Sequence, residues 1–382
     1  MSDTEKDTYT SGSRKDAIFR KIGMNISQLA MPLIALSVLL IFNLIRDPSF
    51  FSIGIATDAK GSVLTGNLIS VLCSASVLAI IAMGMTLVTA SCGGQDISVG
   101  AVGAIAGAFF VIMLHPEKGS ISTLTDFPGG NVVLGVLAAV MAAVIFTLFN
   151  GVLVSVFKIQ PMIATLILFC CGRSIAYYFL FQVFGAGSVK LVNPIIEALG
   201  IAIPGIPIPT PILIMVAMEL LLLLVFKLTN IRLYTQSVGI NQKAARLNGI
   251  NPTVVKLLSF AMLGMCVAVA SVVKISNLGT LTTKSLLDSI EMDAILAVAI
   301  GGNNLGGGKF RLSGSVIGAF TIQMLTTTLN AMQVDPESMR AYKAIVIIVI
   351  MVAGSPVFKT WLSALKNRRK AVTQPSGLRE VT

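Results

Sequence analysis

The stretch SCGGQDISVG, residues 91–100, places a glycine pair, a glutamine and a carboxylate between two long apolar runs. A charged carboxylate is costly near hydrocarbon, so the stretch is either a water-exposed turn or part of a polar route. The glycine pair releases the backbone from helical geometry, and Asp96 stands where an N-cap belongs, before a helix that begins at Ile97. Ser98 and Gly100 then begin a series of small residues that permits close helix packing. Two roles remain open for Asp96: a helix cap alone, or a cap that also lines a solute path.

The composition of the chain identifies a multi-spanning membrane protein. Of its 382 residues, 55% are hydrophobic and 12% are charged, and the mean hydropathy is +0.87. Soluble proteins carry about 25% charged residues, and a soluble globule would lack the interior to hide so much apolar surface. The formal net charge is +11, but Lys and Arg fall in short clusters between apolar spans, which is the pattern of the positive-inside rule. We therefore exclude nucleic acid as a partner.

No catalytic, metal or cofactor site is expected from the sequence. The five cysteines lie in or at the edge of apolar spans, which favours small core residues over disulfides or ligands. The single histidine, His115, cannot form a metal site alone, and no nucleophile, base and acid occur in a spaced set. The stretch GGNNLGGGK, residues 301–309, is not a phosphate loop, because Asn303 and Phe310 stand where that loop requires glycine and Ser or Thr. These features favour a protein that is not an enzyme.

Several long apolar stretches predict membrane-spanning helices, since about 20 residues cross roughly 30 Å of hydrocarbon. We predict an all-α integral membrane protein with about ten transmembrane helices. The eighth stretch is short and ends in glycine, which indicates a broken or re-entrant segment. The predicted spans are residues 27–46, 66–90, 98–115, 132–157, 161–184, 209–227, 254–275, 292–302, 312–333 and 342–362.

The distribution of Lys and Arg predicts the orientation of these spans. Basic residues are concentrated in both tails and in the loop between the sixth and seventh spans. Because cytoplasmic segments carry the excess of Lys and Arg, both termini are predicted to be cytoplasmic. The chain then consists of an N-terminal tail (1–26), a transmembrane domain (27–362) and a C-terminal tail (363–382).

Two stretches resemble each other within the chain. GGQDISVGAVGAIAGAFF begins at Gly93, and GGNNLGGGKFRLSGSVIGAFT begins at Gly301. Each has a glycine pair, a polar stretch, a serine and a small-residue helix that reaches Gly-Ala-Phe. In the predicted topology both turn on the same side, which suggests a parallel repeat, and transporters commonly bind substrate at the interface between repeats.

Arg173 lies deep in the span 161–184, where an arginine costs roughly 2.5–3.5 kcal/mol on insertion scales. It therefore needs a polar partner or a wet cavity, and Asp96 and Glu219 are the candidate partners. A structural ion pair and a position beside a solute path both remain open.

The longest inner loop, residues 228–253, predicts a short cytoplasmic helix. Ile240, Ala244 and Leu247 fall on one helix face. Gly249 suits the left-handed stop after a helix, and Asn251 followed by proline gives a cap for the next span. The helix is either a surface helix or a docking element for a soluble partner.

Four separated motifs give the sequence a family resemblance. GMTLVTASCGGQDISVGAVGAIAGA, NGVLVSVFKIQPMIATLIL, GINQKAARLNGINP and MDAILAVAIGGNNLGGG, in this order, resemble the permease subunits of ATP-binding cassette importers for ribose, xylose, arabinose, galactose and galactofuranose. KIQPMIATLIL and EMDAILAVAIGG look closest to the galactofuranose-type permease. The family's glycine-rich stretch typically reads Gly-Gly-Ile-Asp-Leu-Ser-Val-Gly, so Gln95 and Ile97 depart from its pattern.

The resemblance implies a pore of two permeases (two copies or two related chains), two cytoplasmic ATPase subunits and a periplasmic sugar-binding protein. It also implies that the inner helix is the coupling loop that sits on the ATPase. The residues that match the coupling loop are Ala244, Ala245, Arg246 and Gly249, and those implied near the substrate path are Asp96, Ser98, Asn150, Thr165 and Arg173.

The sequence and its resemblance together predict a permease of the bacterial inner membrane, in contact with membrane lipid. Its substrate is expected to be a monosaccharide, either a pentose or a furanose-form hexose, moved by ATP hydrolysed in a separate subunit. The alternative is an ion-coupled secondary transporter in which Asp96, Arg173 and Glu219 carry protons or cations. A channel or structural protein without solute coupling is a third class.

Overall fold

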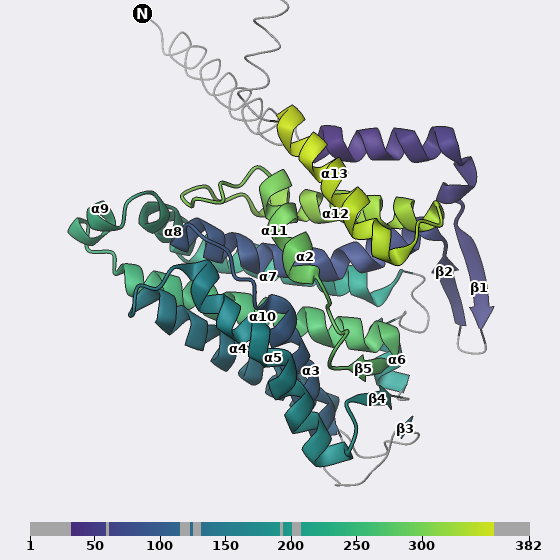
Figure 1. Cartoon of the computed structure of the whole chain (residues 1–382), viewed down its shortest axis with the longest axis horizontal. Helices are drawn as coiled ribbons and strands as arrows, with labels where there is room; N and C mark the ends of the chain where they lie inside the picture. Colours follow the sequence, from purple (N-terminus) through teal and green to yellow (C-terminus); the bar gives the residue numbers. More distant parts are fainter. Residues whose placement is uncertain are drawn as a thin grey trace, which may run out of the picture. The chain divides into compact units, whose positions relative to one another are not determined.

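The computed structural model describes residues 32–58, 61–114, 123–124, 131–191, 194–200 and 208–354. The elements in these ranges are mostly helices (Figure 1). The chain divides into two units, residues 1–328 and 329–382, and the described part of the second unit holds the last residues of α12 and the helix α13 (Pro336–Gly354). His115 and the two predicted tails, residues 1–26 and 363–382, lie outside the described residues.

Within the described residues, six helices are long and apolar enough to cross a membrane. Two shorter apolar helices, Pro32–Arg46 and α3 (Val99–Leu114), accompany them. Each predicted span coincides in large part with a helix, although α13 begins earlier than the predicted span 342–362, which runs beyond the described residues. The six long helices are α2 (Asn67–Cys92), α4 (Val132–Ser155), α5 (Pro161–Phe184), α7 (Thr210–Leu228), α10 (Pro252–Leu278) and α12 (Leu312–Ala331).

The eighth predicted span is the short helix α11 (Ile290–Ile300), which ends at Gly301. Its 11 residues rise by about 16 Å, roughly half the hydrocarbon thickness. The prediction of a short segment here is confirmed.

The chain is mostly helical, as predicted for an all-α membrane protein, and within the described residues five short strands connect the helices. Strands β1 (Gly54–Asp58) and β2 (Gly61–Thr65) form an antiparallel hairpin in which Gly54 pairs with Thr65. In a second sheet β4 pairs in parallel with β3 and antiparallel with β5. The strands of that sheet are β3 (Thr123–Leu124), β4 (Ser188–Leu191) and β5 (Thr280–Thr282).

Helices α2 and α10 form the core of the first unit. About 67% of the α2 span and 72% of the α10 span are buried, whereas 22% of the α7 span is buried. Helix α10 packs most extensively against α4, α2 and α3, beside which it lies in Figure 1. Small residues allow this approach: a Cβ on Gly84 of α2 would lie 3.0 Å from the backbone of Leu263 in α10.

Local sequence signals set the ends of these helices. Helix α10 begins with the Asn251 cap, whose side chain accepts a hydrogen bond from the Thr253 N–H at 3.0 Å. The helices α2, α5 and α10 each end at a glycine with positive φ, namely Gly93, Gly185 and Gly279.

The loop between α7 and α10 contains two helices, α8 (Ile231–Ile240) and α9 (Gln242–Leu247), rather than the one that was predicted. Asn241 has extended backbone angles and caps α9 with its side chain, so the helix cannot continue through it. The predicted face of Ile240, Ala244 and Leu247 is therefore split, and all three residues are exposed.

The buried cluster in this loop consists instead of Val238, Ala245 and Val255, with Ile250 packed against it. Gly249 has a φ of +77°, so the predicted left-handed stop after the helix is confirmed. The Asn251 cap of α10 is confirmed as well.

Candidate functional site: the helix breaks and the Arg173 contacts

The break between α2 and α3 centres on Asp96, which is completely buried. Its Oδ1 accepts hydrogen bonds from the Ser98 N–H at 2.7 Å and from the Ser98 hydroxyl at 2.6 Å. These bonds cap the first turn leading into α3, so the predicted capping role of Asp96 is confirmed in geometry.

The buried polar residues Ser98, Asn150 and Thr165 join this break to α4 and α5. The Asn150 Nδ2 of α4 donates to the Ser98 hydroxyl at 2.8 Å. The Thr165 hydroxyl of α5 accepts from the Ile97 N–H at 3.1 Å and donates to the Pro161 carbonyl at 3.0 Å. Four of the five residues expected near the substrate path thus form one network, and none of these four side chains is exposed.

Two acceptor atoms in this network have no hydrogen-bond partner among the described residues. They are the Asp96 Oδ2 and the Asn150 Oδ1. A buried polar atom without a partner costs about 1–3 kcal/mol, and more if it is charged. The site therefore has unused capacity to accept hydrogen bonds from a donor.

The second glycine-rich motif packs directly against the first. The Gly308 N–H donates to the Ala90 carbonyl at 3.0 Å, and the Gln95 side chain donates to the Leu305 carbonyl at 3.3 Å. A Cβ on Gly93 would lie 2.7 Å from the Gly306 carbonyl oxygen. The backbones of the two motifs touch here with no side chain between them, which explains why both motifs are rich in glycine.

The break between α11 and α12 is capped in a similar way. The Asn303 Oδ1 accepts from the Arg311 N–H at 2.7 Å, and its Nδ2 donates to the Ser315 hydroxyl at 2.8 Å. Ser315 also shares a hydrogen bond of 2.6 Å with Thr86 of α2. The resemblance between the two motifs therefore has a structural counterpart: each break carries a buried Asx side chain that binds the start of the following helix.

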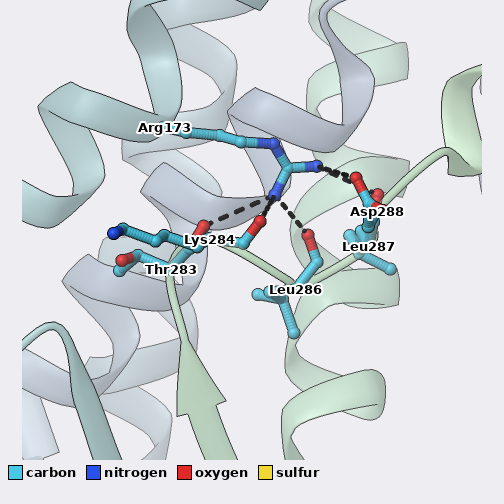
Figure 2. Close-up of polar contacts among 6 residues, drawn as sticks. All are labelled: Arg173, Thr283, Lys284, Leu286, Leu287 and Asp288. Carbon is cyan, nitrogen blue, oxygen red and sulfur yellow. Dashed lines mark hydrogen bonds and ion pairs between the residues drawn. The ribbon is translucent and has the colours of Figure 1, made fainter.

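Arg173 lies apart from this network, and the prediction that it pairs with Asp96 or Glu219 is wrong. Its Nη1 donates to the carbonyls of Lys284 and Leu286 at 3.0 and 2.9 Å (Figure 2). It also forms an ion pair of 3.8 Å with the exposed Asp288. A guanidinium can serve several acceptors at once, so Arg173 fastens α5 to the segment 283–288.

Glu291, which the sequence analysis did not single out, lies beside this arrangement. The residue is 4% exposed, and its Oε2 has no hydrogen-bond partner among the described residues. A Cβ on Gly100 would lie 2.5 Å from that oxygen and 3.2 Å from the Arg173 Nη2. Gly100 thus leaves room for the Glu291 carboxylate near the Arg173 guanidinium. The one sequence feature that could have pointed to Glu291 is its position as an acid at the start of an apolar span.

The segment expected to couple to an ATPase is exposed in large part. Ala244, Arg246 and Leu247 are exposed, whereas Ala245 packs into the small cluster with Val238. Its apolar tip is the more unusual feature, because Leu247 is 89% exposed and Ile240 75% exposed.

No metal centre is formed within the described ranges, where no three His, Cys, Asp or Glu residues come together. The five cysteines are free thiols, but the prediction that they fill the core holds only for Cys266. Cys170 and Cys171 are exposed on α5.

A protein family described as branched-chain amino acid transport system / permease component matches residues 67–354. The chain belongs to this family. Within the family, similar proteins carry names of sugar permeases. The chain is 33% identical over 339 residues to the galactofuranose transporter permease protein of Escherichia coli (strain K12), which covers 88% of this chain and 93% of that protein.

Two further relatives of this kind have nearly the same length. The chain is 34% identical to the fructose import permease protein of Bifidobacterium longum (91% of this chain, 92% of the relative). It is 30% identical to the ribose import permease protein of Escherichia coli (strain K12) (85% of this chain, 92% of the relative). No solved structure matches the chain.

Membership of this family establishes the resemblance proposed from the four motifs. The protein is a permease component of a sugar-importing ATP-binding cassette system rather than an enzyme. With its apolar helices it is a multi-pass protein of the bacterial inner membrane.

The alternative of an ion-coupled carrier finds no support in the family or in the geometry. Asp96 and Arg173 have separate partners. Glu219 of α7 lines a pocket of about 690 Å³ together with Lys227 and Lys309, and neither Asp96 nor Arg173 lines that pocket. Among the described residues, no hydrogen bond or ion pair connects these three side chains into a relay.

Proposed function

We propose that this permease carries a monosaccharide, either a pentose or a furanose-form hexose, into the cytoplasm. The names of its relatives support this substrate class, because they include galactofuranose, fructose and ribose transporters. ATP hydrolysed by a separate cytoplasmic subunit drives the transport, and a periplasmic sugar-binding protein delivers the substrate. The pore contains two permeases, either two copies of this chain or this chain with a related one.

The substrate path in this proposal runs beside the network of Asp96, Ser98, Asn150 and Thr165. The observation in its favour is the pair of buried acceptor atoms, Asp96 Oδ2 and Asn150 Oδ1, that have no donor among the described residues. Sugar hydroxyls are hydrogen-bond donors that suit such acceptors. Polar groups within the membrane commonly mark a substrate pathway. Arg173 supports the wall of this path by holding the segment 283–288.

The ATPase docks on α8 and α9 in this proposal. The observation that carries it is the exposure of Leu247 and Ile240, two large apolar side chains on a loop between membrane spans. Exposed apolar residues at such a place are typical of contacts with a partner. Ala244, Ala245, Arg246 and Gly249 then form the coupling element within the loop 228–253.

The proposed topology has about ten crossings with both termini in the cytoplasm. It assigns the tails 1–26 and 363–382 to the cytoplasm and residues 27–362 to the transmembrane domain. The excess of Lys and Arg in the tails and in the loop of α8 and α9 supports this orientation.

A binding experiment in mild detergent tests the proposal. The purified permease is mixed with the ATPase that is encoded with it, and retention of the ATPase is measured for the wild type, Leu247→Asp and the control Leu278→Asp. Leu278 is also exposed, at 50%, but at the opposite end of α10. We expect Leu247→Asp to lose the ATPase, and the wild type and the control to retain it.

Transport in proteoliposomes completes the test. Wild-type permease with the ATPase and the binding protein is expected to accumulate sugar only when ATP is supplied. Uptake by the permease alone, driven by an ion gradient, would contradict the proposal and favour an ion-coupled carrier.

A further inference from the structure

A small pocket with three basic side chains lies next to the proposed coupling helix. Its volume is about 230 Å³, and a water molecule takes up roughly 30 Å³ of the liquid, so it has room for a small ion and several waters. The pocket is bounded by the end of α4, the start of α5, α9 and the start of α10. Lys158, Arg246 and Lys256 line it, and no Asp or Glu does.

Lys256 of α10 is the most buried of these three basic residues: it is 8% exposed, whereas Lys158 and Arg246 are exposed. Within the described part of the chain its ammonium group has no hydrogen bond and no ion pair. The ammonium is not among the fully buried side-chain atoms that lack a partner, so it retains contact with the space of the pocket that it lines. An anion in that space would give the lysine the partner that buried lysines almost always have.

A second unpartnered group lines the same pocket. The hydroxyl of Ser155 is buried and has no hydrogen-bond partner among the described residues. A hydroxyl donates one hydrogen bond and suits an oxygen acceptor. Lys256 and Ser155 therefore offer donors from two different helices to one space.

The helix directions reinforce this electrostatic preference. Helix α5 begins at Pro161 and helix α10 at Pro252, and both residues line the pocket. The N-terminal end of a helix carries partial positive charge and favours anions. Asp96 is not among the residues that line the pocket.

We propose that this pocket binds an oxyanion, through the Lys256 ammonium and the Ser155 hydroxyl, with Lys158 and Arg246 adding positive charge at its rim. A carboxylate and a phosphate group share the required chemistry. The anion has two sources: a free anion of the cytoplasm, or an acidic side chain of the ATPase, and the second source rests on the proposed function. An occupied pocket would tie Arg246 of α9 to Lys256 of the buried core helix α10.

Inorganic phosphate is the probe for the first experiment, which uses the purified full-length permease in an uncharged detergent. The midpoint of thermal unfolding is measured against phosphate concentration, with sodium chloride of equal ionic strength as the reference. A ligand that binds only the folded protein raises this midpoint. We expect a saturable rise for the wild type and for Lys284→Gln, a control that removes an exposed lysine outside the pocket.

Lys256→Gln is expected to weaken the apparent phosphate affinity by about tenfold or more, as the loss of one charge-assisted hydrogen bond implies. If Lys256→Gln does not fold, Lys158→Gln at the exposed rim is expected to weaken binding in the same direction. No saturable rise in the wild type, or equal affinity in the pocket variants and the wild type, would overturn the proposal.

Adding the ATPase distinguishes the two sources. If an acidic side chain of the ATPase fills the pocket, the phosphate response disappears in the complex, and Lys256→Gln weakens ATPase binding. If a free anion fills it, the response persists in the complex. Failure of the ATPase to bind the wild type at all would contradict the proposed function but leave the result with the isolated permease standing.

Discussion

Gly100 of α3 leaves a space into which the carboxylate of Glu291 fits, with the guanidinium of Arg173 at its border. A Cβ at position 100 would lie 2.5 Å from the Glu291 Oε2 and 2.9 Å from the Leu287 carbonyl oxygen. The contact joins the helix after the first break to the start of α11, the helix before the second break.

Gly100→Ala is expected to lower stability by about 1–3 kcal/mol, the usual cost of overpacking. Part of the clash is with backbone, which cannot rotate away as a side chain can. The measurement is the thermal unfolding midpoint in detergent, with Gly306→Ala as the control, because a Cβ at position 306 meets nothing closer than 3.6 Å. Equal midpoints for the two variants would show that the space at Gly100 is not needed.

A double-mutant cycle tests the bond between Ser98 and Asn150. Ser98→Ala and Asn150→Ala each remove the same 2.8 Å hydrogen bond, so their combined effect is expected to be smaller than the sum by about 0.5–3 kcal/mol. The thermal midpoints of the four proteins give the comparison.

Ser276→Ala is the control partner for that cycle, since the Ser276 hydroxyl is buried and has no partner among the described residues. Its effect and that of Ser98→Ala are expected to add. Additivity of Ser98→Ala with Asn150→Ala as well would mean that the bond contributes nothing measurable.

Gly93→Ala combines two costs that a matched control can separate. Gly93 has a φ of +65° and lies against the Gly306 carbonyl, whereas Gly249 has a φ of +77° with nothing within 4 Å of a Cβ. Gly249→Ala is therefore expected to show the conformational cost alone, roughly 1–2 kcal/mol. Gly93→Ala is expected to lose more, and the excess in the unfolding midpoint measures the contact between the two motifs. A loss no greater than that of Gly249→Ala would argue against a close contact.

Arg173→Lys keeps the positive charge but loses the planar group that donates to several carbonyls at once. We expect faster amide hydrogen exchange in the segment 283–288, because its carbonyls at Lys284 and Leu286 lose their donor. Among the described residues Arg173 forms no hydrogen bond or ion pair with α2, so exchange in α2 is expected to stay unchanged and serves as the internal reference. Unaltered exchange in the segment 283–288 would show that Arg173 does not hold it.

The sequence was sufficient to predict the long apolar helices and several of their ends, because apolar length, glycine stops and Asn caps act over a few residues. The predicted spans 132–157 and 161–184 coincide closely with α4 and α5. The four buried residues of the Asp96 network were also named in advance, three of them through the family resemblance. Their mutual contacts were not, since they connect positions far apart in the chain.

The differences between prediction and structure have two physical origins: tertiary contacts, and local signals that are too short to appear in a periodic pattern. The partner of Arg173 was sought among carboxylates, whereas backbone carbonyls of an irregular segment meet it at 2.9–3.4 Å. The amphipathic face through Ile240 and Leu247 was read as one helix because periodicity does not register a cap at Asn241. The short strands carry too few residues for an alternating pattern to be visible.

The hydrogen bond from Gln95 to the Leu305 carbonyl, which spans 210 residues, has a consequence for biosynthesis. At about 5–20 residues per second, a ribosome takes roughly 10–40 s to produce the second motif after the first has emerged. Throughout that interval the first helix break lacks the contacts that the second motif gives it in the folded chain. The first motif therefore has to remain without its later partner until most of the protein has been synthesised.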